Sequence, residues 1–245
     1  MGDIGKVKET LTKAKKRNLT PSIANAQDYK GYSAVHLAIP NNHEDVVNEL
    51  LNLNVDVNTS LNERSNMENS KKDGFTYSGI TEGRTPLMDA SINGHLSLVR
   101  KLVGRHANID ALDKLKYNAV IFAAQEGQKN VMKYLLENKP VLAEFKGFQS
   151  RTALGIAAMC GRLNVVEELI QNWKVDIDIP DKFHSTPINL AAEYNHLSVV
   201  DYLLQKGANA SIKDEEGKDA IDWAREKGHQ EIINLIKNHL IESFD

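Results

Sequence analysis

Residues 83–102 read GRTPLMDASINGHLSLVRKL, and the order of threonine, proline, glycine and leucine in this stretch predicts two short helices joined by a tight turn. Thr85 is a residue type that caps helix starts by accepting from free backbone N–H groups, and Pro86 suits the first helical position. Gly94 suits the left-handed conformation that ends a helix. The apolar residues after Gly94 keep the i, i+1, i+4, i+5 spacing of one helical face.

The same pattern recurs along the chain. Residues of the N-cap type, or close relatives of it, follow one another at intervals of 33 or 34 residues, with one longer interval of 52: Ser33, Thr85, Asn118, Thr152, Thr186 and Asp219. Each is followed nine residues later by glycine or asparagine: Asn42, Gly94, Gly127, Gly161, Asn195 and Gly228. A fixed period of this length is the signature of a repeat protein.

The repeated unit resembles the ankyrin repeat, whose helical motif T-P-L-H-x-A is carried here by TPLMDA at 85–90 and SAVHLA at 33–38. The segment KGANASIKD at 206–214 resembles the turn at the end of such a unit. The family histidine is kept only at His36. The resemblance implies an all-α fold, an ankyrin-repeat solenoid of antiparallel helix pairs with β-hairpin loops.

The spacing also predicts the domain boundaries. We expect an N-terminal capping half-repeat at 1–28, a first repeat at 29–58, a polar insertion loop at 59–80, and repeats 2–6 with a C-terminal cap at 81–245. The insertion accounts for the one long interval. Insertions in repeat arrays go to loops, often on the binding face.

Composition excludes several classes of function. The formal net charge of −3 lacks the basic signature of a nucleic-acid binder, and no apolar run approaches the roughly 20 residues that span a bilayer. The single cysteine, Cys160, allows no disulfide framework within the chain. These features predict a cytoplasmic protein, or one delivered into a host cytoplasm if it is an effector.

No residue pattern predicts catalysis, a cofactor or a metal site. Five of the eight histidines occupy repeat positions spread over four repeats, so we expect no converging set of ligands, and no H-E-x-x-H, C-x-x-C, G-x-S-x-G or phosphate loop occurs. The basic cluster Lys13, Lys15, Lys16 and Arg17 is favoured at a helix C-terminus by the helix dipole. Binding to an anionic membrane surface is the weaker interpretation of that cluster.

The positions that the repeat leaves free predict the function. The resemblance implies that partners contact the hairpin tips and the outer end of the first helix of each unit. Those positions carry residue types enriched at protein interfaces, namely Tyr29, Tyr32, Leu115, Tyr117, Phe148, Arg151, Met159, Phe183 and Tyr194. Packing of some of these side chains on neighbouring loops is the alternative.

We therefore expect a non-enzymatic protein–protein interaction module, an adaptor, scaffold or effector, that binds a partner protein on this concave face. The alternative is a targeting or regulatory domain of a larger enzyme whose catalytic part lies outside this chain. Asn58 is a possible modification site, because Leu50, Asp56 and Asn58 resemble the pattern that asparaginyl hydroxylase recognises in ankyrin repeats.

Overall fold

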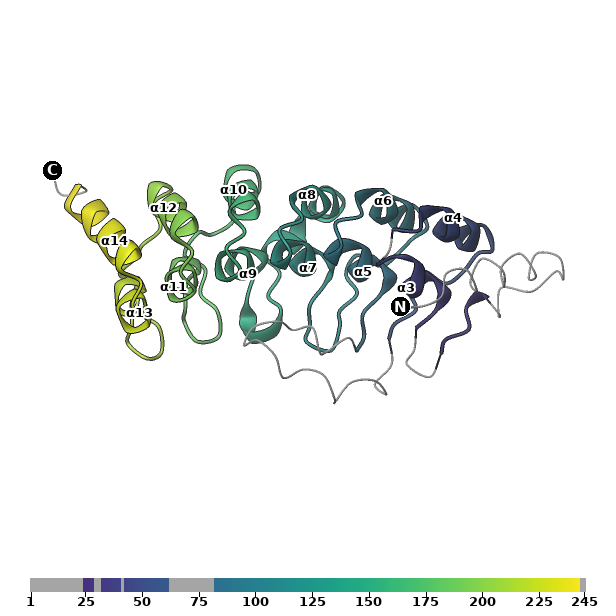
Figure 1. Ribbon diagram of the computed structural model, residues 1–245, viewed down its shortest axis with the longest axis horizontal. Coiled ribbons are helices and arrows are strands. Elements are labelled where there is room, and N and C mark those ends of the chain that lie inside the picture. The colour runs from purple at the N-terminus through teal and green to yellow at the C-terminus, as the bar shows by residue number, and fades with distance from the viewer. Residues whose placement is uncertain (1–23, 29–31, 41, 62–81, 243–245) are drawn as a thin grey trace. The chain divides into compact units, whose positions relative to one another are not determined.

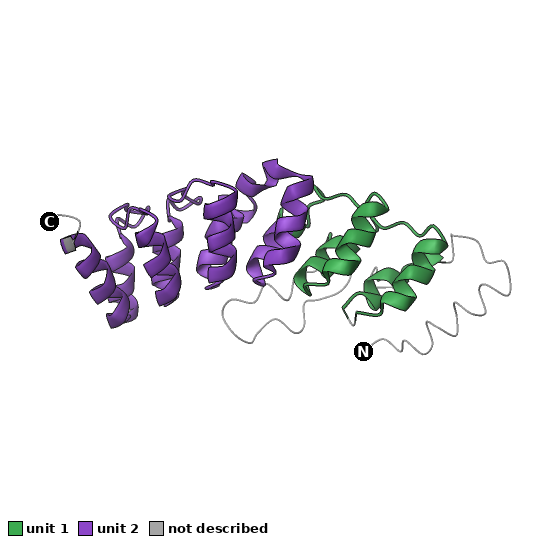
Figure 2. Cartoon of the chain, turned by 90° about the horizontal axis from the view of Figure 1, so that it is seen from above, with its two compact units in different colours: residues 1–119 green, residues 120–245 purple. Residues whose placement is uncertain are grey.

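The computed structural model describes residues 24–28, 32–40, 42–61 and 82–242. The chain divides into two compact units, residues 1–119 and residues 120–245 (Figure 2). Each unit is built from pairs of short helices (Figure 1).

The first unit holds two helix pairs in its described part. Their bounds are α3 (Ala34–Ala38), α4 (Glu44–Asn52), α5 (Pro86–Ile92) and α6 (Leu96–Gly104). Within each pair the helices pack on one another, and α3 also contacts α5 of the next pair. The apolar stripe that the sequence predicts on α4 is buried at Val46, Val47, Leu50 and Leu51.

The second unit continues with four more helix pairs, the first of which begins at the last residue of the first unit. The bounds are α7 (Ala119–Gln125), α8 (Lys129–Asn138), α9 (Ala153–Met159), α10 (Leu163–Asn172), α11 (Pro187–Glu193), α12 (Leu197–Gln205), α13 (Ala220–Lys227) and α14 (Gln230–Glu242). Helices α9, α11 and α13 form one layer, and α8, α10, α12 and α14 form a second (Figure 1). Two 3₁₀ turns, η1 (Pro140–Glu144) and η2 (Phe148–Ser150), lie between α8 and α9.

Helix starts and helix ends follow the sequence signals. The side chains of Thr85, Thr152 and Asp219 accept from the backbone N–H three residues on, as N-caps do. All six glycine and asparagine residues predicted to end the first helices have positive φ, between 53° at Asn42 and 77° at Gly228. The turn inside each helix pair is therefore set by local sequence.

The loops between pairs form short turns that we call tips. A tip is five residues long, and the N–H of its first residue donates to the carbonyl of its fifth. The tips closed in this way include 113–117, 147–151, 181–185 and 214–218. The expected helix-pair fold is confirmed. Among the described residues, however, the tips contain no strand, because a single closing bond is too short a ladder to make one.

The base of the insertion is fixed by backbone pairing. Leu61 is buried; its N–H donates to the Arg84 carbonyl at 3.0 Å, and its own carbonyl accepts from the Gly83 N–H at 2.9 Å. Residues 62–81, which make up most of the expected insertion loop, lie outside the described residues.

Candidate partner-binding surface

Successive tips in the second unit are joined directly to one another. The Lys182 N–H donates to the Gln149 carbonyl at 2.7 Å, and the Glu215 N–H donates to the Phe183 carbonyl at 2.9 Å. These bonds use the second or third residue of each tip. They hold three tips in a row, each directly before the N-cap of a first helix, α9, α11 or α13.

An aspartate organises the two C-terminal tips. Oδ1 of Asp181 accepts from the N–H groups of Phe183 and Ser185 at 2.8 and 3.0 Å. Asp214 does the same for Glu216 and Lys218 at 2.9 and 3.0 Å. The tip at 147–151 has Gly147 in place of this aspartate, and both Gln149 and Ser150 have positive φ there.

The last residue of a tip bonds to the aspartate of the next tip. Nε of Arg151 donates to Oδ2 of Asp181 at 2.9 Å, and the two side chains are 11% and 2% exposed. In the same way, Oγ of Ser185 donates to Oδ2 of Asp214 at 3.5 Å. Residues at this position therefore connect one repeat to the next.

A pocket of about 250 Å³ lies where these tips meet α11 and α13. Phe183 and Ser185 contribute from one tip, and Asp214, Glu215 and Glu216 from the next. Leu190, Glu193 and Tyr194 line it from α11 and the residue after it, with Trp223 of α13 and Arg151 completing the wall. We call this the tip pocket.

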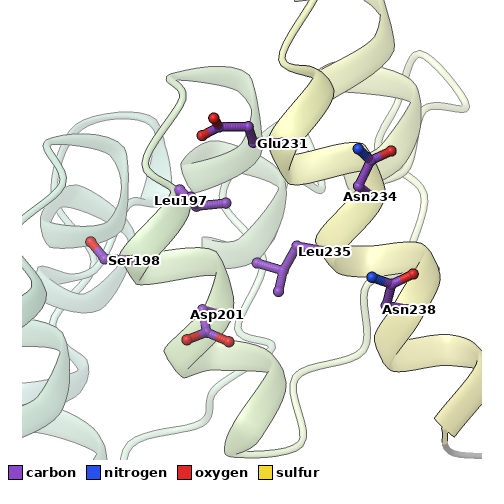
Figure 3. Close-up of a pocket in the computed structure, with 7 residues that line it drawn as sticks. All are labelled: Leu197, Ser198, Asp201, Glu231, Asn234, Leu235 and Asn238. Carbon is purple, nitrogen blue, oxygen red and sulfur yellow. The ribbon is translucent and has the colours of Figure 1, made fainter.

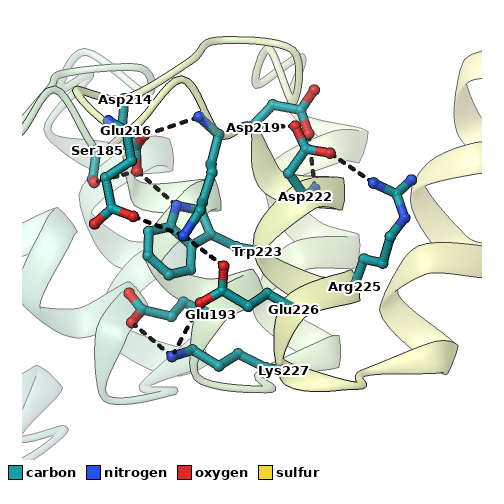
Figure 4. A network of polar contacts seen from close by, with 11 residues as sticks. Ser185, Glu193, Asp214, Glu216, Asp219, Asp222, Trp223, Arg225, Glu226 and Lys227 are labelled. Atoms are coloured by element: carbon teal, nitrogen blue, oxygen red, sulfur yellow. Dashed lines mark hydrogen bonds and ion pairs between the residues drawn. The ribbon is translucent and has the colours of Figure 1, made fainter.

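Trp223 fixes one wall of the tip pocket, as Figure 4 shows. Its Nε1–H donates to Oδ2 of Asp214 at 2.7 Å. Nζ of Lys218 lies 4.1 Å from the ring centroid and also pairs with Glu216 and Glu226 at 2.7 and 2.5 Å. These two carboxylates raise the pKa of Lys218, so it stays charged at neutral pH.

Glu193 is the half-buried carboxylate of the tip pocket. Burial raises its pKa, and the nearby carboxylates of Glu216 and Asp214 also raise it, while Lys227 and Arg151 act in the opposite direction. Its ion-pair contact with Nζ of Lys227 is long, at 3.9 Å. The charged form of Glu193 is therefore only weakly compensated.

The predicted contact residues differ in how far their side chains are exposed to solvent. Phe148 and Phe183 are exposed, at 36% and 37%. Tyr32, Leu115, Arg151 and Tyr194 are partly exposed. Tyr29 lies outside the described residues. The structure brings Arg151, Phe183 and Tyr194 together at the tip pocket.

For two of the predicted contact residues, the expected exposure to solvent is wrong. Tyr117 is 0% exposed, because the last residue of a tip directly precedes the N-cap and turns inward. Met159 is 4% exposed as the last residue of α9, and its sulfur accepts from Nη1 of Arg151 at 3.4 Å. Both side chains belong to the packed interior.

The contact residues predicted from the sequence do not include the acidic side of the tip pocket, which is made of Glu193, Asp214, Glu215 and Glu216. Aligning 214–217 with the tip at 181–184 would have placed Glu215 and Glu216 at the positions of Lys182 and Phe183. The sequence does not single out Trp223 as a surface residue, because a tryptophan on a helix is typical of the hydrophobic core.

A second, more open pocket of about 630 Å³ lies between α12 and α14 (Figure 3). Leu197 and Leu235 face one another across it, with Ser198, Asp201, Glu231, Asn234 and Asn238 around them. It contains none of the predicted contact residues and no aromatic side chain. Its exposed apolar residue, Leu197, provides a useful comparison for Phe183.

Three matches to the family model described as "Ankyrin repeats (3 copies)" cover residues 61–146, 87–181 and 154–243, and a match to "Ankyrin repeat" covers residues 30–62. The chain belongs to the ankyrin repeat family. Ankyrin repeats are protein-interaction modules, and the fold is generally non-catalytic. A protein-interaction role agrees with a candidate surface built from aromatic and charged side chains on hydrogen-bonded turns.

Curated relatives match over one part of the chain only. Ankyrin repeat and SAM domain-containing protein 6 from Mus musculus is 45% identical over 56 residues, and the protein of the same name from Rattus norvegicus is 41% identical over 56 residues. Each match covers 22% of this ankyrin repeat chain and 6% of the relative.

Two histidines of the second unit donate to backbone carbonyls of the preceding repeat. Nε2–H of His196 donates to the Met159 carbonyl at 2.9 Å, and Nε2–H of His229 donates to the Glu193 carbonyl at 3.0 Å. Within the described ranges, no group of three or more His, Cys, Asp or Glu side chains could hold a metal ion. Nor does any described helix have the length and apolar character to cross a membrane.

The side chain of Asn58 joins two adjacent loops of the first unit. Its Nδ2 donates to the His106 carbonyl at 3.3 Å, and its Oδ1 accepts from the Asn108 N–H at 2.7 Å. Both ends of the Asn58 amide are therefore hydrogen-bonded within the fold. Hydroxylation of Asn58 stays a prediction.

Proposed function

We propose that this ankyrin repeat chain is a non-enzymatic adaptor, scaffold or effector that binds a protein partner on the tips of its second unit. The observation that carries this proposal is the tip pocket, where exposed Phe183 and partly exposed Tyr194 lie beside charged groups on hydrogen-bonded turns. Aromatic anchors held rigidly lose little entropy on binding, which favours affinity.

Phe148 extends this surface along the row of tips, because the Gln149 carbonyl next to it accepts from Lys182 N–H at 2.7 Å. An interface of apolar anchors with a charged rim has the composition of protein-binding sites. Tyr117 and Met159 are left out of the proposed surface because they are buried. Neither nucleic acid nor a membrane surface is part of the proposal, and the place of action we propose is the cytoplasm.

The experiment compares variants for affinity toward a partner first identified by affinity capture and then purified. Phe183→Ala removes an anchor that is 37% exposed and should weaken binding by over about tenfold, roughly 1.4 kcal/mol. Leu197→Ala is the matched control, since Leu197 is 38% exposed but lies on α12 outside the tip pocket. Thermal melting of both variants establishes that they are folded.

Equal affinities for wild type and Phe183→Ala would overturn the proposed surface, as would a loss of binding that merely follows unfolding. A loss of binding in Leu197→Ala alone would move the site to the groove between α12 and α14.

The length of the relatives suggests a second candidate function. The matched region is 6% of each relative, so these repeats occur there within much longer proteins. The repeats would then be the targeting or regulatory part of a larger protein with a catalytic domain elsewhere. Joining the chain to its native neighbours and assaying their activity with and without Phe183→Ala would separate the two functions.

A further inference from the structure

The tip pocket has the size for one side chain. Its volume of about 250 Å³ falls below the roughly 300–1,000 Å³ typical of sites for drug-sized ligands. The wall contributed by Phe183, Leu190 and Tyr194 is apolar and aromatic. A side chain with an apolar stem would gain contact area along that wall.

The charge around the pocket is negative. Four carboxylates line it, those of Glu193, Asp214, Glu215 and Glu216, against one guanidinium, that of Arg151. Arg151 is already paired with Asp181 at 2.9 Å, so it contributes little free positive charge.

The four carboxylates differ in how far nearby donors and cations balance their negative charge. Asp214 accepts four hydrogen bonds from within the second unit, and Glu216 pairs with Lys218 at 2.7 Å. Among the described residues, the ion pair of Glu193 is the long 3.9 Å contact with Nζ of Lys227, and Arg151 adds a favourable charge interaction. Glu215 is exposed at the second position of its tip. Glu193 and Glu215 are therefore the groups best able to receive a further cation.

We propose that the tip pocket receives an arginine side chain of the protein partner, with its guanidinium between Glu193 and Glu215 and its stem against Phe183 and Tyr194. A guanidinium has five donors in a plane, so it bonds to two carboxylates while stacking on an aromatic face. It is also more weakly hydrated than an ammonium group, which lowers the cost of entering a half-buried site.

The electrostatics of Glu193 support this occupant. Burial and the neighbouring carboxylates oppose its charged form, and Lys227 and Arg151 offset this only in part. An incoming cation would relieve that cost. Lys218 does not fill the role, because its Nζ is held by Glu216 and Glu226 over the Trp223 ring. Nζ of Lys227 comes only within 3.9 Å of Glu193, and Nζ of Lys182 lies 5.8 Å from the centre of the Phe183 ring.

The chain carries its own reporter for this test. It has two tryptophans, and Trp223 lines the tip pocket with its indole N–H on Asp214, whereas Trp173 follows α10 outside the pocket. Their indole N–H signals can be followed by NMR in the full chain. The probe is Nα-acetyl-L-arginine amide, and the matched neutral probe is Nα-acetyl-L-citrulline amide.

The Trp223 signal should move and saturate with the arginine probe, with a dissociation constant of about 1–10 mM. The Trp173 signal should stay in place, and citrulline should bind at least about fivefold more weakly because it lacks the charge. Raising the ionic strength from about 0.01 M to about 0.15 M should weaken binding, since the Debye length falls from about 30 Å to about 8 Å.

Two variants with equal charge changes locate the effect. The double variant Glu193→Gln/Glu215→Gln should weaken the arginine probe by at least about fivefold. The double variant Asp201→Asn/Glu231→Gln, on α12 and α14 beside the other pocket, should leave the affinity unchanged. Thermal melting establishes that both proteins remain folded.

The inference is overturned if citrulline moves the Trp223 signal as far as arginine does. It is equally overturned if both tryptophan signals move together, if the Glu193→Gln/Glu215→Gln variant binds like wild type, or if the Trp223 shift grows linearly with probe up to about 20 mM, without curvature. This inference rests on the proposed function, but its failure is distinct. Loss of partner binding in Phe183→Ala without an arginine response would sustain the surface and reject the occupant.

Discussion

Replacing Gly161 with alanine tests how closely the turn between α9 and α10 fits the next repeat. Gly161 has φ of +67°, a left-handed conformation that costs an alanine roughly 1–2 kcal/mol. A Cβ added there would lie 2.7 Å from Cε1 and 2.9 Å from Cγ of His196, and closer still to Nδ1. The ring cannot move freely, because its Nε2–H donates to the Met159 carbonyl at 2.9 Å.

The expected loss combines two effects. Displacing His196 breaks that hydrogen bond and leaves a carbonyl poorly solvated at about 1–3 kcal/mol, in addition to the left-handed cost. Gly161→Ala should therefore lower the free energy of unfolding by roughly 2–5 kcal/mol. Gly127→Ala is the control: φ is +74°, and the nearest heavy atom to the added Cβ is Cδ of Arg162, at 3.1 Å, a contact that a shift of a few tenths of an ångström would relieve. It should lose about 1–2 kcal/mol.

Urea unfolding followed by far-ultraviolet circular dichroism measures these differences. The double variant Gly161→Ala/His196→Ala completes a cycle, and the coupling between the two sites should be at least about 1 kcal/mol. Gly228→Ala, where φ is +77° and no heavy atom lies within 4 Å of the added Cβ, should behave like Gly127→Ala. Equal losses for Gly161→Ala and Gly127→Ala, or no coupling to His196, would refute the reasoning.

Two further outcomes follow from buried side chains of the first unit. Tyr117→Ala should lower the free energy of unfolding by roughly 3–5 kcal/mol in urea, because the ring is 0% exposed, whereas Lys114→Ala in the same tip should change it by less than about 0.5 kcal/mol. A small loss for Tyr117→Ala would contradict its burial. Burial lowers the pKa of His36 below 6.5. The contribution of neutral His36 to the free energy of unfolding is therefore fully present above pH 6.5 and is lost as the pH falls through the folded-state pKa. Unfolding free energies measured between pH 7.5 and pH 5 should fall more steeply for wild type than for His36→Gln, and parallel curves would exclude this role for His36.

The helix pairs could be predicted because their determinants are local. The left-handed turn at Gly161 needs a residue without a Cβ, and the N-cap at Thr152 needs a short side-chain oxygen. Both requirements involve only a few neighbouring residues, and the same pattern occurs in six successive repeats. The same period placed the tips, and with them the face on which Phe183 is exposed.

The repeat period did not determine which tip residues reach solvent. Tyr117 and Phe183 are both aromatic residues of a tip, yet Tyr117 is buried and Phe183 is 37% exposed. The period identifies them as the fifth and third residues of their tips, but it does not say which of these two positions is buried. Exposure depends on what packs against a side chain, and that is decided by residues a full repeat away.

Sequence by itself determined the family, the helix pairs and their turns, since each is specified within about one period of the chain. Only the tertiary structure decided the tip pocket, because Arg151, Glu193 and Trp223 come from three different repeats and meet through stacking. It also decided the electrostatics there. The pKa of Glu193 is raised by burial and by carboxylates more than twenty residues away, and no pattern local to Glu193 contains that information.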